Sequence, residues 1–377
     1  MYIHIKNGHI IDPYRNQNTI GDVWIRNHKV ISTEEAEEIK KGKVMEIDAQ
    51  GHYVIPGLID FHAHGFASGS PLGINPELVL ANGVTTMVDA GTAGAGAFEA
   101  FYDTVLSRST LTMRSLLNVS TIGIVGAGID EDLSPELFLT DKIKYLCEKY
   151  KGIIIGLKMR MSEGCLRNSG IESLKAAKKL AEEVELPLFV HSTGSAMDVD
   201  ILANELKSGD VYCHIYQGSK FNAMKNDQMS DAIRKARQRG VLFDDAHGLV
   251  NYSIDIAKKA VAQGFLPDFI STDHTTLTLY RDGFAKSLTH IISEYMEFGM
   301  DLYDILNIVL VNSSKFLKME GQIGTLQPGA FADVAVLKPM NGKPYYSDLT
   351  SSFTGSRILC NMMTIKNGTI VYRSDAF

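Results

Sequence analysis

The sequence predicts an α/β fold in which a (β/α)8 barrel is joined to a small β-rich domain built from both ends of the chain. Two observations support this prediction. Short, apolar, β-rich segments recur through the middle of the 377-residue chain and alternate with stretches of helical periodicity. The tetrapeptide Ile-Lys-Asn-Gly occurs near the N-terminus and again near the C-terminus, which indicates related strands at the two ends.

The two ends of the chain are rich in β-forming residues. Near the N-terminus, Asn7-Gly8 lies between two such segments in residues 2–12, a pattern typical of a hairpin. The second copy of the motif predicts another hairpin in residues 364–372, and residues 332–337 read as a further strand. We therefore expect residues 1–53 and 321–377 to form one domain, with residues 54–320 inserted as the barrel.

The middle of the chain contains eight strand candidates at spacings of about 25–40 residues, which suit βα units. A closed (β/α)8, or TIM, barrel is the simplest architecture that holds eight of them. The rival is a doubly wound open sheet, but no Gly-x-Gly-x-x-Gly follows the first strand. Residues 171–183 are one of the predicted helices. The eight candidates are Val54–Phe61, Val84–Asp89, Arg114–Ser120, Ile153–Met159, Pro187–His191, Val211–His214, Val241–Asp244 and Asp268–Thr272.

Composition and charge narrow the class of partner. The formal net charge of −7 gives no support to nucleic-acid binding, and the apolar runs are too short for a membrane span. The N-terminus lacks the layout of a signal peptide, and the four scattered cysteines form no Cys-x-x-Cys pair, which predicts reduced thiols in a cytoplasmic protein. We expect a small-molecule substrate, a homo-oligomer, and no nucleic-acid or membrane partner.

Two histidines end the first strand candidate. His62 and His64 are two residues apart, so on a strand they point to the same face. Two imidazoles that converge on one point are suitable ligands for a divalent metal ion. Taken alone, the pair is weak evidence for a metal site, and two unrelated histidines are the alternative.

Further ionisable residues end later strand candidates, where a buried charge requires a partner. Each has a structural alternative: a lysine that reaches solvent, a hydrogen-bonded histidine, or a helix N-cap for the aspartate. Burial would instead lower the lysine's pKa and expose a free amine that can react with carbon dioxide to give a carbamate. A carbamate is an anionic ligand that can bridge two metal ions. These residues are Lys158, His191, His214 and Asp273.

The ordered set His-x-His, Lys, His, His, Asp resembles the amidohydrolase superfamily, in the subset with two metal ions bridged by a carboxylated lysine. Residues 56–64 (PGLIDFHAH) and 324–333 (GTLQPGAFAD) are similar to that superfamily's usual sequences. The resemblance implies that the domain from both termini is a β-sandwich. It also implies two divalent ions, with zinc expected and manganese, iron or nickel compatible with the same ligands.

The resemblance implies a role for each ligand candidate. His62, His64 and Asp273 would hold one ion, His191 and His214 the other, and carboxylated Lys158 would bridge them. Asp273 would also act as the general base and then the general acid, while the ions provide hydroxide at neutral pH.

Within that superfamily, the sequence is similar to those of dihydroorotases and of related small-molecule deacetylases. Phe66 stands where dihydroorotases carry an arginine that binds the substrate carboxylate. We therefore expect a hydrolase acting on a small acetylated amino or hydroxy acid, with the Phe66 ring favouring an apolar substrate group. The alternatives are a cyclic amidohydrolase, a heterocycle deaminase, or an inert structural homologue; Lys158 argues against the deaminase, and the full ligand set argues against the inert homologue.

Four residues outside the ligand set are candidates for substrate contacts, each with a surface or structural role as the alternative: Arg160, Arg167, His247 and His274. Either arginine could bind a carboxylate in a bidentate manner. The glycine-rich residues 91–97 follow the second strand candidate without a Lys-Ser or Lys-Thr ending. This predicts a mobile active-site loop rather than a phosphate-binding loop.

Overall fold

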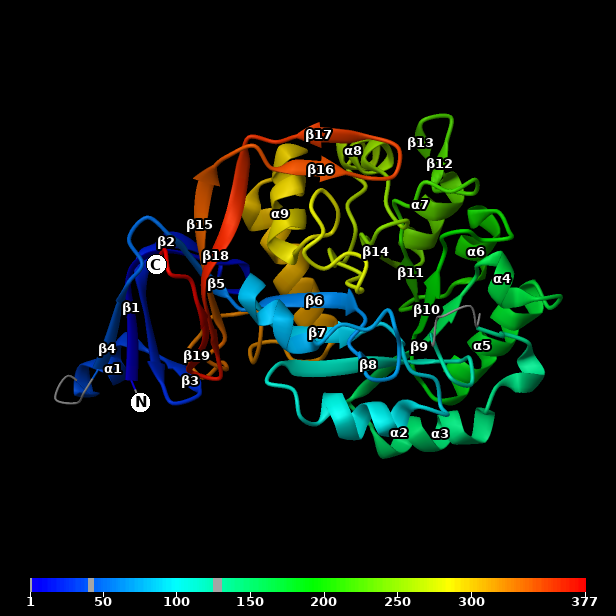
Figure 1. Cartoon of the computed structure of the whole chain (residues 1–377), viewed down its shortest axis with the longest axis horizontal. Helices are drawn as coiled ribbons and strands as arrows, with labels where there is room; N and C mark the ends of the chain where they lie inside the picture. Colours follow the sequence, from blue (N-terminus) through cyan, green and yellow to red (C-terminus); the bar gives the residue numbers. More distant parts are fainter. Residues whose placement is uncertain (1, 40–43, 125–130) are drawn as a thin grey trace.

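The computed structural model describes residues 2–39, 44–124 and 131–377. Figure 1 shows a sheet built from both chain ends on one side of the molecule and a parallel sheet with its helices on the other. The fold is therefore mixed α/β. Within the described ranges, none of the helices combines the length and the apolar character needed to cross a membrane.

A seven-stranded sheet forms the centre of the molecule, and all of its neighbouring strands run parallel. Most of its residues are buried, as expected for a parallel sheet covered by helices. Its strands follow one another in chain order: β6 (Leu58–Ala63), β7 (Val84–Asp89), β8 (Thr112–Asn118), β9 (Ile154–Arg160), β10 (Leu188–His191), β11 (Val211–Cys213) and β14 (Leu242–Asp244).

The eighth strand candidate, Asp268–Thr272, is not a continuous strand. Residues 268–274 instead make two isolated parallel bridges, from Phe269 to Asp244 at one edge of the sheet and from His274 to Ala63 at the other. The backbone N–H of Asp273 also donates to the carbonyl of His62 at 2.7 Å. Asp273 has a φ of 49°, which interrupts the extended conformation. One irregular segment therefore links the two edge strands of the sheet.

The first strand candidate, Val54–Phe61, is wrong as a single strand. It is divided between β5 (Tyr53–Pro56), which belongs to the terminal sheet, and β6 of the parallel sheet. The break lies at Gly57, where a Cβ atom would come within 2.2 Å of the Thr85 hydroxyl. A residue without a side chain is needed because the backbone approaches β7 closely at this point.

Helices connect the parallel strands and cover the sheet. The helix expected over residues 171–183 is confirmed with the same bounds, and its buried face carries Leu174, Ala177 and Leu180. The helices are α1 (Thr33–Ile39), α2 (Phe98–Phe101), α3 (Thr140–Lys149), α4 (Glu163–Leu166), α5 (Ile171–Glu183), α6 (Val199–Glu205), α7 (Asp231–Gln238), α8 (Ile254–Ala262), α9 (Leu288–Glu297), α10 (Leu302–Leu306) and α11 (Ser313–Phe316). Two π-helical turns lie at Tyr102–Leu106 and Asn307–Asn312, and 3-10 turns lie at Pro13–Arg15, Pro76–Asn82 and Pro135–Leu137.

The two chain ends share one eight-stranded sheet, which has its own cluster of buried apolar side chains. The pairing joins all of these strands into a single sheet, so the expected sandwich of two sheets is not confirmed, and the division into two domains stays a prediction. The strands are β1 (Tyr2–Asp12), β2 (Gln17–Arg26), β3 (Lys29–Ile31), β4 (Val44–Asp48), β5, β15 (Val334–Asn341), β18 (Arg357–Lys366) and β19 (Thr369–Arg373). Two small hairpins, Met224–Met229 and Tyr345–Thr354, complete the strands.

The repeated Asn-Gly motif has two different outcomes. Asn367-Gly368 forms the turn between β18 and β19, as predicted. Asn7-Gly8 is instead a bulge inside the continuous strand β1, so the hairpin prediction there is wrong. The reason is tertiary: β1 pairs with β2 on one side and with β4 and then β5 on the other, which keeps the strand extended past the bulge.

Candidate active site

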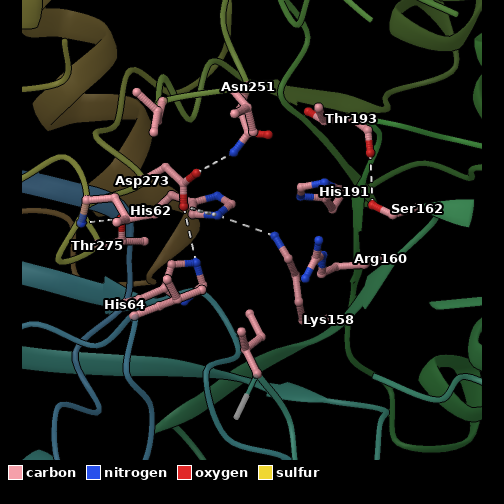
Figure 2. A pocket seen from close by; sticks show the side chains of 15 residues that line it. His62, His64, Lys158, Arg160, Ser162, His191, Thr193, Asn251, Asp273 and Thr275 are labelled. Atoms are coloured by element: carbon pink, nitrogen blue, oxygen red, sulfur yellow. Dashed lines mark hydrogen bonds and ion pairs between the residues drawn. The ribbon is translucent and has the colours of Figure 1, made fainter. Parts of the chain in front are cut away.

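A cavity of about 330 Å³ opens at the C-terminal ends of the parallel strands. In parallel α/β folds, this end of the sheet carries the catalytic residues. Figure 2 shows that ionisable side chains from β6, β9, β10 and the segment 268–274 point into this cavity. The ionisable lining residues are His62, His64, Lys158, Arg160, His191 and Asp273.

The first group of ligand candidates lies around Asp273. Its Oδ1 lies 3.1 Å from Nε2 of His64 and 3.6 Å from Nε2 of His62. The other carboxylate oxygen accepts a hydrogen bond of 2.6 Å from the amide of Asn251, which also lines the cavity. Three potential ligand atoms therefore converge, and they satisfy the spacing required to hold one metal ion.

Both histidines of this group are held from behind through Nδ1. His62 Nδ1 lies 2.7 Å from the carboxylate of Asp244 on β14, and His64 Nδ1 lies 2.8 Å from the hydroxyl of Thr92. Such contacts fix the ring orientation and leave Nε2 facing the cavity. Neither Asp244 nor Thr92 was predicted as a site residue from the sequence; the position of Asp244 at the end of a parallel strand was the available signal.

Lys158 lies fully buried on β9, with its Nζ 3.4 Å from His62 Nε2 and 3.7 Å from the sulfur of Cys213. Its stem packs against Gly91, where a Cβ atom would come within 2.6 Å of the Lys158 Cβ. The glycine-rich residues 91–95 are themselves buried and bridge to Asn118 and Gly123. Residues 91–95 are therefore packed against the lysine, whereas Gly96 is exposed, and the mobility of the loop stays a prediction.

The second pair of histidines lies beside this lysine. His191 ends β10 and His214 follows β11, and the centroids of the two rings are 4.4 Å apart. His214 adopts a φ of 62°, and its Nδ1 contacts the carbonyl of Ala246 at 2.8 Å. Its buried Nε2 has no hydrogen-bond partner among the described residues. A buried nitrogen without a hydrogen-bond partner, directed away from its anchor, is available as a metal ligand.

The protonation states of these groups also suit metal ligation. Burial lowers the pKa of His214 to about 3 and holds the pKa values of His62 and His191 well below their usual value, so these rings are neutral at pH 7. Burial alone would raise the pKa of Asp273, but the hydrogen bond with His64, and the positive charge that the neighbouring histidines gain only at low pH, hold it below its usual value. Neutral imidazoles and an ionised carboxylate are the forms that bind a divalent metal. The donor set therefore fits metal ions.

The four candidates for substrate contacts have different locations. Arg160 lines the cavity and pairs with the carboxylate of Glu131 at 2.9 Å. Arg167 is about half exposed, lies 3.6 Å from Asp132, and does not line this cavity. His247 and His274 are buried away from the cavity surface. The His247 ring stacks on Tyr252 and lies 2.8 Å from Glu294, as expected for a structural histidine.

Phe66 does not line the cavity, contrary to expectation. Its ring is buried in the apolar core and packs on Phe101, with centroids 4.6 Å apart. The residue is also absent from the cavity lining. Other side chains give the cavity its apolar surface: Leu72, Ile124, Leu249, Val250 and Leu277.

A match to a known protein family accompanies these features of the site. Residues 53–371 match the model of the amidohydrolase family, and the chain therefore belongs to this family. It is a hydrolase that acts on carbon–nitrogen bonds. Members of the family generally depend on a binuclear metal centre, and His62, His64 and Asp273 have the spacing to bind a metal ion.

Comparison with individual proteins narrows the branch of the family. The chain is 30% identical to a deacetylase of Enterococcus faecalis over 292 residues, which cover 76% of this chain and 77% of the relative. It is 29% identical to a deacetylase of Agrobacterium fabrum over 294 residues, which cover 77% of this chain and 71% of that protein. The crystal structure of an adenine deaminase superposes with a TM-score of 0.86, at 25% identity and with 99% of both chains covered.

Proposed function

We propose that this protein is a metal-dependent hydrolase that cleaves the amide or ester bond of a small acetylated amino or hydroxy acid. Five of the six ligand candidates line one cavity together with Arg160, and the sixth, His214, packs against His191; this convergence is the observation that carries the proposal. The deacetylase names of two relatives at 29% and 30% identity point to the same reaction.

The proposed catalytic unit is a (β/α)8 barrel over residues 54–320, with the chain ends as a separate β domain. His62, His64 and Asp273 would hold one ion, His191 and His214 the second, and a carboxylated Lys158 would lie between them. When bound, divalent ions of this kind lower the pKa of a coordinated water and polarise a carbonyl group. Zinc is the proposed metal. A cytoplasmic location and a homo-oligomeric assembly are proposed on the sequence alone.

The protein's own side chains would carry out the remaining steps. Arg160 would bind the substrate carboxylate in the cavity. Asp273 would accept the proton of the attacking water on its Oδ1 and deliver it to the leaving nitrogen or oxygen. Asn251 would keep Asp273 oriented during this transfer through the hydrogen bond to Oδ2. The apolar lining of Leu72, Leu249 and Val250 would exclude water from the acyl group.

A deaminase is the second candidate, because the solved structure of an adenine deaminase is 25% identical to this chain over nearly its whole length. A cyclic amidohydrolase would use the same metal ligands. Adenine carries no carboxylate, whereas the guanidinium of Arg160 in the cavity favours an acid. Dihydroorotate does carry a carboxylate, so the cyclic amidohydrolase differs from the proposed function in the bond cleaved, a ring amide instead of an acetyl group.

The test is a substrate screen with protein that has been stripped by a chelator and reloaded with zinc or manganese. N-acetyl amino acids and O-acetyl hydroxy acids of both chiralities are assayed beside adenine and dihydroorotate, and bound metal is measured in parallel. We expect about two metal equivalents, activity on the acetylated acids, and loss of activity with the chelator. Turnover of adenine or dihydroorotate with no activity on any acetylated acid would contradict the proposal.

A further inference from the structure

The carboxylate of Glu131 lies buried beside the cavity, and it plays no part in the metal-ligand set. Only about 2% of its side chain is exposed. Oε1 accepts a hydrogen bond of 2.7 Å from the amide of Asn118 at the end of β8, and Oε2 accepts one of 2.9 Å from Nη1 of Arg160 at the end of β9. The thiol of Cys165 lies 3.8 Å from Oε2. The carboxylate is thus fixed on both oxygens.

The guanidinium of Arg160 is held on one side only. Glu131 occupies Nη1, about 30% of the arginine side chain is exposed, and Nε has no partner within the described parts of the chain. Figure 2 shows the guanidinium in the same cavity as the Lys158 amine and the His191 ring. An arginine with one N–H fixed and others free is prepared for a second, planar acceptor such as a carboxylate.

We propose that Glu131 is a positioning residue that holds Arg160 in the orientation that binds the substrate carboxylate, so that the site selects anionic acyl substrates. The inference rests on the reaction proposed above. The binding of the carboxylate can nevertheless be measured without turnover. Without this anchor, the long arginine side chain would have to be ordered by the substrate itself, and binding would weaken.

A neighbouring pair in the same region provides an internal comparison. Asp132 and Arg167 also form an acid–arginine pair, but at 3.6 Å, with about 38% and 48% of the two side chains exposed, and away from the cavity lining. Exposed pairs of this kind contribute little, because solvent screens them. Both pairs join an acid to an arginine, and the two acids are adjacent in the sequence. The pairs differ in burial and in their access to the cavity.

The informative change is Glu131→Gln, which keeps the shape of the side chain. Its single carbonyl oxygen can accept from Asn118 or from Arg160, but its amide group is itself a donor and cannot accept from the other. One of the two anchoring hydrogen bonds is therefore lost. A hydrogen bond to a charged group corresponds to about a ten- to hundredfold change in affinity.

The probes are N-acetylglycine and its neutral amide, N-acetylglycinamide, which differ only in the carboxylate and carry no chirality. Binding to the metal-loaded protein is measured as KM where a probe is hydrolysed and as Kd by calorimetry where it is not. In Glu131→Gln we expect the constant for the acid to rise about ten- to hundredfold, with kcat within about twofold of wild type where turnover occurs. The constant for the amide should stay unchanged.

Two further variants separate positioning from a general structural role. Asp132→Asn is the matched control and should leave binding of both probes unchanged. In an Arg160→Gln background, adding Glu131→Gln should have no further effect on the acid, because Glu131 acts only through the arginine. The double variant also leaves no unpaired buried charge, so it remains measurable if the single Glu131 variant is unstable.

Several outcomes would overturn the proposal. Wild-type protein that binds the acid no better than the amide, a Glu131→Gln variant that binds the acid as tightly as wild type, or an equal loss of both probes would each do so. The proposed reaction fails separately: if neither the probes nor other acetylated acids are hydrolysed but the acid still binds in a Glu131-dependent manner, positioning stands without that reaction. Conversely, if acetylated acids are hydrolysed but binding of the acid does not depend on Glu131, the proposed reaction stands and the positioning role fails.

Discussion

The carboxylate of Asp244 lies 2.7 Å from Nδ1 of His62, and both side chains are buried. A carboxylate only accepts hydrogen bonds when ionised, so it holds the Nδ1 proton and leaves the lone pair of Nε2 directed at the cavity. Its other oxygen is held by the hydroxyl of Ser271 at 2.7 Å. One strand end, 182 residues from His62 in sequence, therefore sets the orientation of a proposed metal ligand.

Replacing Asp244 by asparagine should weaken metal binding without removing a ligand. The amide cannot carry charge, and losing a carboxylate behind a ligating histidine typically costs about ten- to hundredfold in metal affinity. Competition with a chromophoric chelator measures the change. Asp210→Asn is the control, since Asp210 is also buried but accepts backbone N–H groups of Leu188 and Lys207 instead. An equal loss of metal affinity in both variants would contradict the assigned role.

Removing the amine of Lys158 should abolish metal binding and activity together. In Lys158→Ala no carbamate can form, so the two proposed ions lose their shared ligand, while a small added carboxylate should partly restore both properties. Metal content and activity are measured on the same preparations, and NMR after incubation with labelled bicarbonate detects the carbamate in wild type. Lys175→Ala, at an exposed position on α5, is the control. A fully metallated and active Lys158→Ala variant would disprove the bridging role.

Substitutions at the two arginine candidates, Arg160 and Arg167, should have different effects on kcat/KM. Arg160→Gln removes a charged contact to the substrate, which typically contributes about 1.5–3 kcal/mol, or roughly ten- to a hundredfold in kcat/KM. Metal content should stay at the wild-type level. Arg167→Gln should leave kcat/KM unchanged because that side chain is about half exposed and does not line the cavity. Steady-state kinetics on an acetylated acid measure both; a larger loss in Arg167→Gln would reverse the assignment.

Asp245 should make stability depend on pH. Burial raises the pKa of Asp245 to about 7 from its usual value of 3.8, so the native state holds this proton more tightly than the unfolded chain does. The raised pKa therefore stabilises the native state fully below about pH 4, and this contribution is lost as the pH rises to about 7.

Asp245→Asn removes the titrating group, so it should raise Tm relative to wild type at pH 8 and give a smaller gain at pH 5. Thermal unfolding at the two pH values, at one fixed metal concentration, measures the difference. Asp255→Asn, which changes an exposed aspartate paired with Lys259, should show no such pH-dependent gain. A gain that is the same at both pH values would mean that Asp245 does not titrate as expected.

Local patterns were sufficient to predict the strand ends that carry five of the six ligand candidates, but not the irregular segment that carries Asp273. Side chains alternate between the two faces of a strand, and this periodicity can be read from a short stretch of sequence. It places the side chains of His62 and His64 on one face, and the ends of apolar segments mark the positions of Lys158, His191 and His214. The amphipathic pattern of α5 gave its bounds to the residue. Side-chain direction along a strand is a local property, so the sequence alone could place these groups on one edge of the sheet.

What the sequence could not decide were the contacts between segments that lie far apart in the chain. Gly57 divides one apolar run between two sheets because Thr85 packs against it, and Asn7-Gly8 becomes a bulge because β1 has strands on both sides. Phe66 turns into the core, where Phe101 receives its ring. The partners of His62 and Arg160, Asp244 and Glu131, were equally hidden. Pairing across a fold depends on which surfaces meet after the elements have formed, and that information is in the packing of the whole chain rather than in any single stretch of it.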